Sequence, residues 1–193
     1  VYRPLNYPEI MLWRVNRWAR QTPWTAPPRP GSAEAGRVSL NVRLMLNERR
    51  GEVINIAHFG KTSKMASITF TGLPGGNMPP YLTVRQAEYV AQQASAWDAD
   101  ALPVAEKALG GWRVSLPAGL SRQVWLDFRP DRATCRPGRY LGGMNLSFGN
   151  GTKLYVPIDL TVESLRMPDR KTVGVTMWDY TDCGGQFGLQ DGP

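Results

Sequence analysis

Apolar residues recur at every second position over most of this chain, and this alternation constrains its fold more than any other sequence feature. The pattern begins after residue 37, with Val38, Leu40, Val42, Leu44 and Leu46. A period of two places successive side chains on opposite faces of a β-strand, so one face can be buried while the other meets solvent. The pattern predicts a half-buried strand here, followed by a polar turn over residues 47–51.

Similar segments follow at regular spacing, with turn residues between them. We expect further strands over residues 53–60, 66–71, 81–91, 112–116, 121–128, 140–148, 153–162 and 171–180. An Asn-Gly pair lies between 140–148 and 153–162, which is a strong signal for a hairpin. No helical segments of 10–15 residues alternate with these strands, which excludes a βαβ architecture. About nine strands with mostly antiparallel pairing predict an all-β sandwich.

Residues 1–36 differ from the rest and are expected to form an N-terminal arm or strap. Met11, Val15 and Trp18 have helical spacing, so residues 8–20 fit a short helix, although the same run also fits an extended arm. Four prolines within residues 22–32 favour a stiff linker or a wrapping strap. We therefore divide the chain into an irregular or partly helical arm (1–36), a sandwich domain (37–182) and a Gly-rich linker or tail (183–193).

The net charge of +7 is concentrated in two segments. Residues 1–30 hold five arginines against one glutamate, residues 129–140 hold four arginines against one aspartate, and the remainder is neutral. Two separate segments do not make the continuous basic stripe that follows a phosphate backbone, so we expect no nucleic-acid partner. The charge is better suited to a neighbouring protein or an anionic glycan.

Two stretches resemble a known domain family. They are residues 42–56 and a region that runs from Pro137-Gly138-Arg139-Tyr140-Leu141-Gly142-Gly143 through Val156-Pro157-Ile158-Asp159-Leu160-Thr161-Val162 to Trp178-Asp179-Tyr180. Together they resemble the immunoglobulin- or fibronectin-like sandwich that precedes a glycoside-hydrolase-like barrel in large secreted bacterial proteins. That family has a G-x-Y-x-G strand, then a V-P-[IVL]-x-L-x-V strand, then a strand ending in W-D-[YF] that leads into the barrel.

The resemblance covers roughly residues 37–182 and implies an immunoglobulin-like fold. It implies that Trp178, Asp179 and Tyr180 mark the exit toward a partner domain, and that the protein is bacterial and either secreted or on the cell surface. No barrel follows Asp182, and Val1-Tyr2-Arg3-Pro4 does not begin a signal peptide. We therefore expect a processed chain or a part of a longer polypeptide.

The sequence contains no recognisable catalytic constellation. Glycoside hydrolysis needs two carboxylates facing each other across a cleft, and the only close pairs, Asp98/Asp100 and Asp179/Asp182, fit solvated turns. His58 is the only histidine, and we expect it to have a structural role at a strand end. We predict no catalytic residues, no metal and no cofactor, and therefore no enzyme activity unless the chain is a fragment of a larger enzyme. No apolar run is long enough to span a membrane.

The tryptophans and the N-terminal arginines are the candidate contact residues. Trp112, Trp125 and Trp178 lie within predicted strands and are expected in the core. Four others lie outside clear strands and could stack on sugar rings or pack the arm onto the sandwich: Trp13, Trp18, Trp24 and Trp97. A basic stripe of Arg14, Arg17 and Arg20 could meet an anionic partner or form a solvated face. Cys135 and Cys183 either form a disulfide or remain free thiols.

These observations predict a non-catalytic β-sandwich module of a secreted glycan-processing or cell-surface protein. Such a module would position a neighbouring domain or bind carbohydrate. The alternative is a structural, self-associating surface subunit whose N-terminal arm packs on the next copy, because edge strands make such exchange available. The expected partners are a neighbouring domain, other copies of the chain or a polysaccharide.

Overall fold

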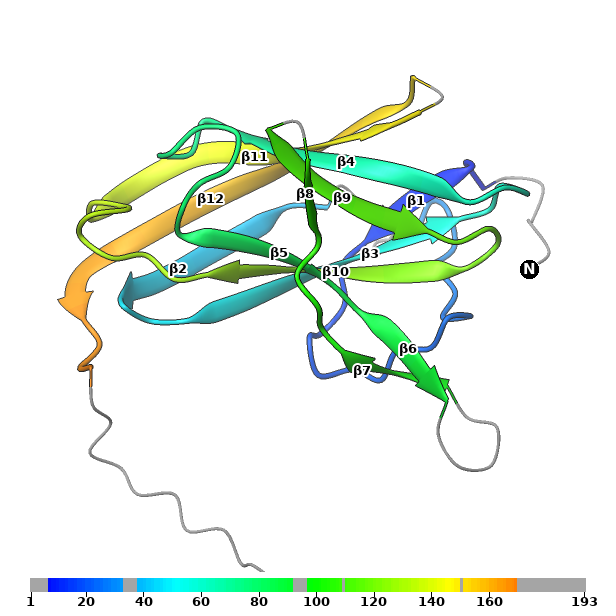
Figure 1. Ribbon diagram of the computed structural model, residues 1–193, viewed down its shortest axis with the longest axis horizontal. Coiled ribbons are helices and arrows are strands. Elements are labelled where there is room, and N and C mark those ends of the chain that lie inside the picture. The colour runs from blue at the N-terminus through cyan, green and yellow to red at the C-terminus, as the bar shows by residue number, and fades with distance from the viewer. Residues whose placement is uncertain (1–6, 33–37, 92–96, 109, 150, 170–193) are drawn as a thin grey trace, which may run out of the picture.

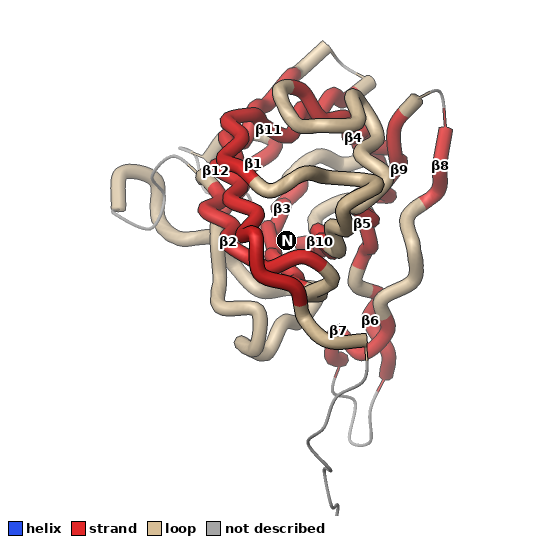
Figure 2. Tube along the Cα trace, turned by 90° about the vertical axis from the view of Figure 1, so that its left-hand side faces the viewer, coloured by secondary structure: helices blue, strands red, loops and turns tan. Residues whose placement is uncertain are grey.

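The computed structural model describes residues 7–32, 38–91, 97–108, 110–149 and 151–169, and within these ranges it contains strands but no helix (Figure 2). The twelve strands are β1 (Ile10–Trp13), β2 (Leu40–Leu46), β3 (Arg50–His58), β4 (Lys64–Thr71), β5 (Leu82–Gln86), β6 (Glu88–Ala91), β7 (Trp97–Ala101), β8 (Glu106–Ala108), β9 (Gly111–Leu116), β10 (Ser121–Phe128), β11 (Gly138–Phe148) and β12 (Lys153–Arg166).

The strands form two facing sheets and one small hairpin (Figure 1). A four-stranded sheet has the order β1-β3-β10-β5, and a six-stranded sheet has the order β2-β12-β11-β4-β9-β8. The β6–β7 hairpin projects below them (Figure 1). All pairings are antiparallel except that of β2 with β12, which is parallel. The predicted all-β, immunoglobulin-like sandwich is confirmed. It has more strands than expected because β1, β7 and β8 are short and residues 81–91 divide into two strands.

The main core lies between the two sheets and follows the two-residue alternation. On β2, Leu40, Val42, Leu44 and Leu46 are each at most 2% exposed, whereas the intervening Asn41 and Arg43 face solvent. On β10, the inward-facing residues are Val124, Leu126 and Phe128, all fully buried. Each such side chain contributes roughly 1.5–3 kcal/mol through burial. The opposite, outward-facing side of β10 is therefore free to carry other chemistry.

Tyr140 explains part of the G-x-Y motif. Its hydroxyl donates to the carbonyl oxygen of Arg136, at 2.8 Å and four residues upstream, which is the arrangement of the tyrosine corner in immunoglobulin-like domains. Farther along β11, a Cβ on Gly142 would overlap the carbonyl oxygen of Thr71 on β4. The motif therefore serves packing between the loop, β11 and β4.

Substituting Tyr140 by phenylalanine should lower the free energy of unfolding by about 1 kcal/mol, because it removes one hydrogen bond and keeps the ring. Urea denaturation would measure the change. Tyr155→Phe is the matched control, since Tyr155 is 54% exposed on β12. An equal effect in the two variants would contradict the role given to the Tyr140 hydroxyl.

The helical interpretation of the N-terminal arm is wrong. Residues 10–13 form β1, which pairs antiparallel with β3 and brings Met11 opposite Ala57 and Trp13 opposite Asn55. The edge of β3 offers unpaired backbone groups and an apolar surface, and together these outweigh a helix signal of only three spaced apolar residues.

After β1, the arm folds back as a strap across the outer face of the four-stranded sheet. Asn55 Nδ2 donates to Gln21 Oε1 at 2.6 Å, and the Ser121 amide donates to the Pro23 carbonyl oxygen at 2.8 Å. The Ser121 hydroxyl donates to the Thr25 carbonyl oxygen at 2.7 Å. The strap alternative is thus the correct one for these residues, and the described part of the arm binds its own chain.

Several predictions fall on residues 170–193, outside the described residues: the strand at 171–180, the exit at Trp178, Asp179 and Tyr180, and the tail with Cys183. These stay predictions. Across the described ranges, no helix has the length and apolar character needed to cross a membrane.

Candidate functional site

The structure divides the predicted contact tryptophans into two groups. Trp18, Trp24 and Trp97 are 83%, 57% and 40% exposed, as expected for surface residues. Trp13 is only 3% exposed, which agrees with packing of the arm onto the sandwich and not with stacking on a sugar ring. It lies on the outer face of the four-stranded sheet, in register with Asn55, the residue that the strap's Gln21 binds.

Trp125 is more exposed than its predicted place in the core implies. The alternation of β10 places Gln123, Trp125 and Asp127 on the outer face of the sheet, opposite the apolar residues of the core. Trp125 is accordingly half-buried rather than in the core. The sequence contains the signal for this placement, because these three residues alternate with Val124, Leu126 and Phe128, which point into the core.

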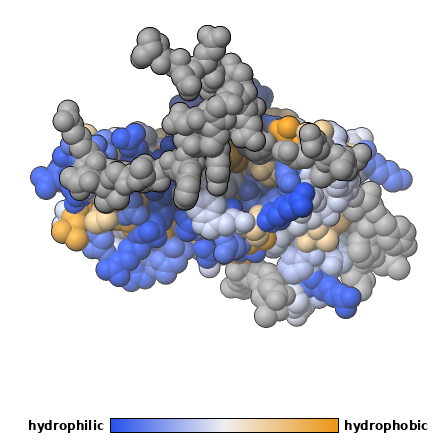
Figure 3. Space-filling model, turned by 90° about the horizontal axis from the view of Figure 1, so that it is seen from below, coloured by the Kyte–Doolittle hydropathy of each residue, from blue (hydrophilic) through white to orange (hydrophobic). Residues whose placement is uncertain are grey.

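A groove runs along this outer face of β10. Two hollows of about 570 and about 380 Å³ share Arg17, Trp18, Leu102 and Trp125. A third hollow, of about 300 Å³, adjoins the second at Arg49, Arg85 and Asp127. We call these three hollows together the β10 groove. Figure 3 views the molecule from the side on which the β6–β7 hairpin projects, and its uncovered surface is mostly hydrophilic, with small hydrophobic patches.

Trp125 forms a fixed aromatic surface on the groove floor. A Cβ at Gly51 would lie 3.0 Å from Cε3 of Trp125, so the ring rests where Gly51 of β3 has no side chain. At its other edge, the indole Nε1 donates to Gln123 Oε1 at 2.6 Å. The ring is therefore oriented before any ligand arrives, and part of its surface lines the groove.

Gln123 brings an unsatisfied donor to the same floor. It is 3% exposed, lines the largest hollow, and its Nε2 has no hydrogen-bond partner. Its register partner on β3, Asn55, has an equally unsatisfied Oδ1. Buried polar groups are normally paired, so an orphaned donor at a groove indicates a missing partner. The Gln123 amide could donate a hydrogen bond to a hydroxyl group that enters this hollow, whereas Asn55 lines none of the three hollows.

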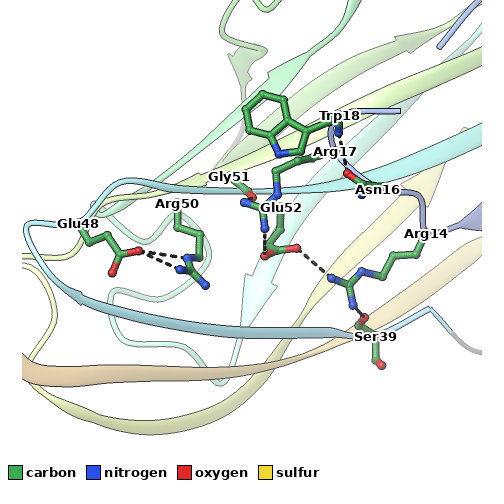
Figure 4. A network of polar contacts seen from close by, with 9 residues as sticks. All are labelled: Arg14, Asn16, Arg17, Trp18, Ser39, Glu48, Arg50, Gly51 and Glu52. Atoms are coloured by element: carbon green, nitrogen blue, oxygen red, sulfur yellow. Dashed lines mark hydrogen bonds and ion pairs between the residues drawn. The ribbon is translucent and has the colours of Figure 1, made fainter. Parts of the chain in front are cut away.

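Arg14 and Arg17 do not form a free basic stripe, because both bind Glu52 (Figure 4). Arg14 Nη2 lies 3.0 Å from Glu52 Oε2, and Arg17 Nη2 lies 3.3 Å from Oε1. Arg17 also donates to the carbonyl oxygen of Gly51 at 2.5 Å. These contacts cover the edge of β3 beyond the end of β1, and they hold the Arg17 stem and the adjacent Trp18 at the groove wall.

Arg20 closes one end of the groove. Its Nε lies 2.7 Å from Asp98 Oδ1, and the Ala99 amide donates to the Gln21 carbonyl oxygen at 3.1 Å. The hydrogen bond to Asp98 raises the pKa of Arg20. Because Asp98 and Ala99 belong to β7, these contacts join the strap to the β6–β7 hairpin.

The other end of the groove is rich in arginine. Arg49 binds the Asp127 carboxylate through two nitrogens, at 2.9 and 2.6 Å, and this hydrogen bonding raises the pKa of Arg49. Arg85 Nε lies 3.3 Å from the same carboxylate, and its Nη1 donates to the Leu102 carbonyl oxygen. Arg50 pairs with Glu48 at 3.1 Å. The polar side chains of the groove are thus held in place by one another.

His58 supports a strand end, in agreement with its expected structural role. It is 1% exposed, and its Nδ1 lies 3.3 Å from the Pro117 carbonyl oxygen. Its Nε2 is 3.6 Å from Glu9 Oε1, and a hydrogen bond from Lys64 to Glu9 lowers the pKa of that carboxyl. No three His, Cys, Asp or Glu side chains gather into a metal-binding group in the described part of the chain.

Cys135 is 2% exposed, and burial raises the pKa of its thiol. It lies beside Tyr81 and Tyr140, on the loop before β11. Since Cys183 lies outside the described residues, a disulfide between the two remains a prediction.

Comparison with known proteins gives a fold but no family. No protein-family profile and no curated protein matches the chain. Among solved structures, a family 123 glycoside hydrolase from Clostridium perfringens is similar with a TM-score of 0.50 and 8% identity. The match covers 68% of this chain and 24% of that one, so this chain corresponds to about a quarter of the hydrolase.

Two smaller domains also show similarity. A PapD-like domain of human CEP192 matches with a TM-score of 0.40 and 9% identity, over 87% of this chain and 95% of that one. The CARDB domain of the PF1109 protein from Pyrococcus furiosus matches with a TM-score of 0.37 and 10% identity, over 84% of this chain and all of that one.

Proposed function

We propose that this chain is a non-catalytic module of a secreted glycan-processing or cell-surface protein, and that it binds carbohydrate in the β10 groove. The observation that carries the proposal is the groove floor, where the fixed ring of Trp125 lies beside the unsatisfied amide of Gln123. A sugar ring has an apolar face that suits an aromatic surface, and it has hydroxyls that both donate and accept. Trp125 and Gln123, which are neighbours on the same face of β10, meet these two requirements.

The arrangement of the groove carboxylates supports a binding role over catalysis. Glycoside hydrolysis needs two carboxylates facing the scissile bond. In the groove, Glu48, Asp98 and Asp127 are each bound to an arginine of the same wall or floor. The similarity to about a quarter of a glycoside hydrolase supports the proposal that this chain lies beside another domain in a longer protein. The module would then also help to position that neighbouring domain.

The test compares two tryptophan variants in carbohydrate binding. Wild-type protein is applied to an array of neutral and acidic oligosaccharides, and the retained glycans are titrated calorimetrically. Trp125→Ala should weaken binding by about tenfold or more, because an aromatic stacking contact contributes roughly 1–3 kcal/mol. Trp24→Ala is the matched control, since Trp24 is exposed but does not line the groove.

Thermal unfolding of each variant would show that the fold is retained. If the wild type binds no glycan, or if Trp125→Ala binds as tightly as Trp24→Ala, the proposal is wrong.

A further inference from the structure

The side chains around the β10 groove carry an excess of positive charge. Six arginines line its three hollows, against three carboxylates, Glu48, Asp98 and Asp127; the arginines are Arg17, Arg20, Arg49, Arg50, Arg85 and Arg129. Lysine does not occur among these lining residues. Arginine presents a planar fork of donors that matches carboxylate and sulfate oxygens.

The excess is greatest at the end of the groove beyond Trp125. Arg49 and Arg85 both bind Asp127, whose side chain is only 13% exposed, so one carboxylate serves two guanidinium groups. Arg129 lines the same hollow and belongs to no ion pair among the described residues, although its charge is among those that lower the pKa of Asp131. The backbone amide of Arg129 donates to the Tyr81 carbonyl oxygen at 2.8 Å, and this hydrogen bond fixes the backbone from which the Arg129 side chain extends.

These features follow one another along β10 in a fixed order. Gln123 offers an unsatisfied donor, Trp125 offers a ring surface, and Arg129 follows directly after the strand end. Six residues of extended chain span about 20 Å, which is long enough for several consecutive sugar units. A polysaccharide with acidic groups could therefore contact all three positions at once.

The aromatic side chains of the groove fit a nucleic acid less well than a glycan. The groove has two tryptophans, Trp18 and Trp125, rather than a row of aromatic side chains spaced for successive bases. Its polar side chains can exchange hydrogen bonds with the hydroxyl groups that every unit of a glycan carries.

We infer that the glycan bound in the β10 groove is anionic, and that its carboxylate or sulfate group binds at the end formed by Arg49, Arg85 and Arg129. This inference rests on the proposed function, because it assigns the chemical class of the ligand to the same groove.

Paired probes test this inference. Oligogalacturonate is compared with its methyl-esterified form, which keeps the sugar backbone and removes the charge, and dextran sulfate is compared with dextran. Wild-type protein should bind at least one charged probe about tenfold or more tightly than its neutral counterpart, and this preference should fall as salt is raised. The two pairs distinguish a carboxylate ligand from a sulfate ligand.

Arg129→Gln should remove most of the preference for the charged probe and leave binding of the neutral probe unchanged. Arg113→Gln is the matched control, because Arg113 lies on β9 of the six-stranded sheet and lines none of the three hollows. Both variants change the net charge by the same amount, so a difference between them reports position rather than total charge.

The outcomes separate this inference from the proposed function. Equal binding of charged and neutral probes, with loss on Trp125→Ala, would overturn the anionic ligand and keep the carbohydrate groove. Equal effects of Arg129→Gln and Arg113→Gln would also overturn it. Tighter binding of oligothymidylate than of any glycan would replace it with a nucleic-acid ligand. Loss of binding in Arg129→Gln but not in Trp125→Ala would keep the anion site and overturn the proposed contact between Trp125 and the glycan.

Discussion

Replacing Trp13 with alanine should lower the free energy of unfolding by about 3–5 kcal/mol, the usual effect of truncating a buried tryptophan. Trp13 is 3% exposed, on the outer face of the four-stranded sheet, in register with Asn55. Truncation would leave a cavity on the outer face of β1 and β3, and it would weaken the attachment of the arm to the sheet. Equilibrium denaturation in urea would measure the change.

Trp24→Ala provides the control for this prediction. Trp24 belongs to the same arm but is 57% exposed, so its truncation should change stability by about 0.5 kcal/mol or less. Equal effects of the two substitutions would mean that β1 is not an integral strand of the sandwich.

Phe128→Ala should destabilise the protein by a similar amount, about 3–5 kcal/mol. Phe128 is fully buried between the two sheets at the end of β10. Because Arg129 follows it directly, we expect this variant to lose binding in the groove as well as stability. Thermal unfolding and glycan titration would measure the two effects.

Phe128→Leu separates packing from the presence of an aromatic ring. It retains most of the apolar volume and should cost about 1 kcal/mol, as volume-conserving core substitutions do. If Phe128→Ala were as stable as Phe128→Leu, the core assignment of Phe128 would be wrong.

The strands themselves were largely predictable. The segment 121–128 forms β10 with the same bounds, and the alternation on β2 matches its burial residue by residue. The short strands were not predictable, because a run of three or four residues holds too little pattern. For β1, the helical spacing of Met11, Val15 and Trp18 pointed to the wrong structure, since pairing with the edge of β3 decided the conformation.

The candidate site was predictable only in part. Trp18, Arg17 and Arg20 were identified as contact residues, and they do line the groove. Their partners were not identified, because the ion pairs of Arg17 with Glu52 and of Arg20 with Asp98 join positions 35 and 78 residues apart. No local pattern reports such pairs. They arise when the strap crosses the sheet.

The amino-acid sequence by itself determined the fold class and the two faces of each long strand, because alternation of apolar residues acts locally and has a direct consequence for burial. It also determined that Gln123, Trp125 and Asp127 share a face. Only the tertiary structure decided that this face is a groove. Its walls come from the strap, the β6–β7 hairpin and the start of β3, and their positions depend on long-range contacts. Long-range contacts also bury Trp13 and leave Trp18 exposed. They place Arg14 and Arg17 in ion pairs with Glu52 instead of a free basic stripe.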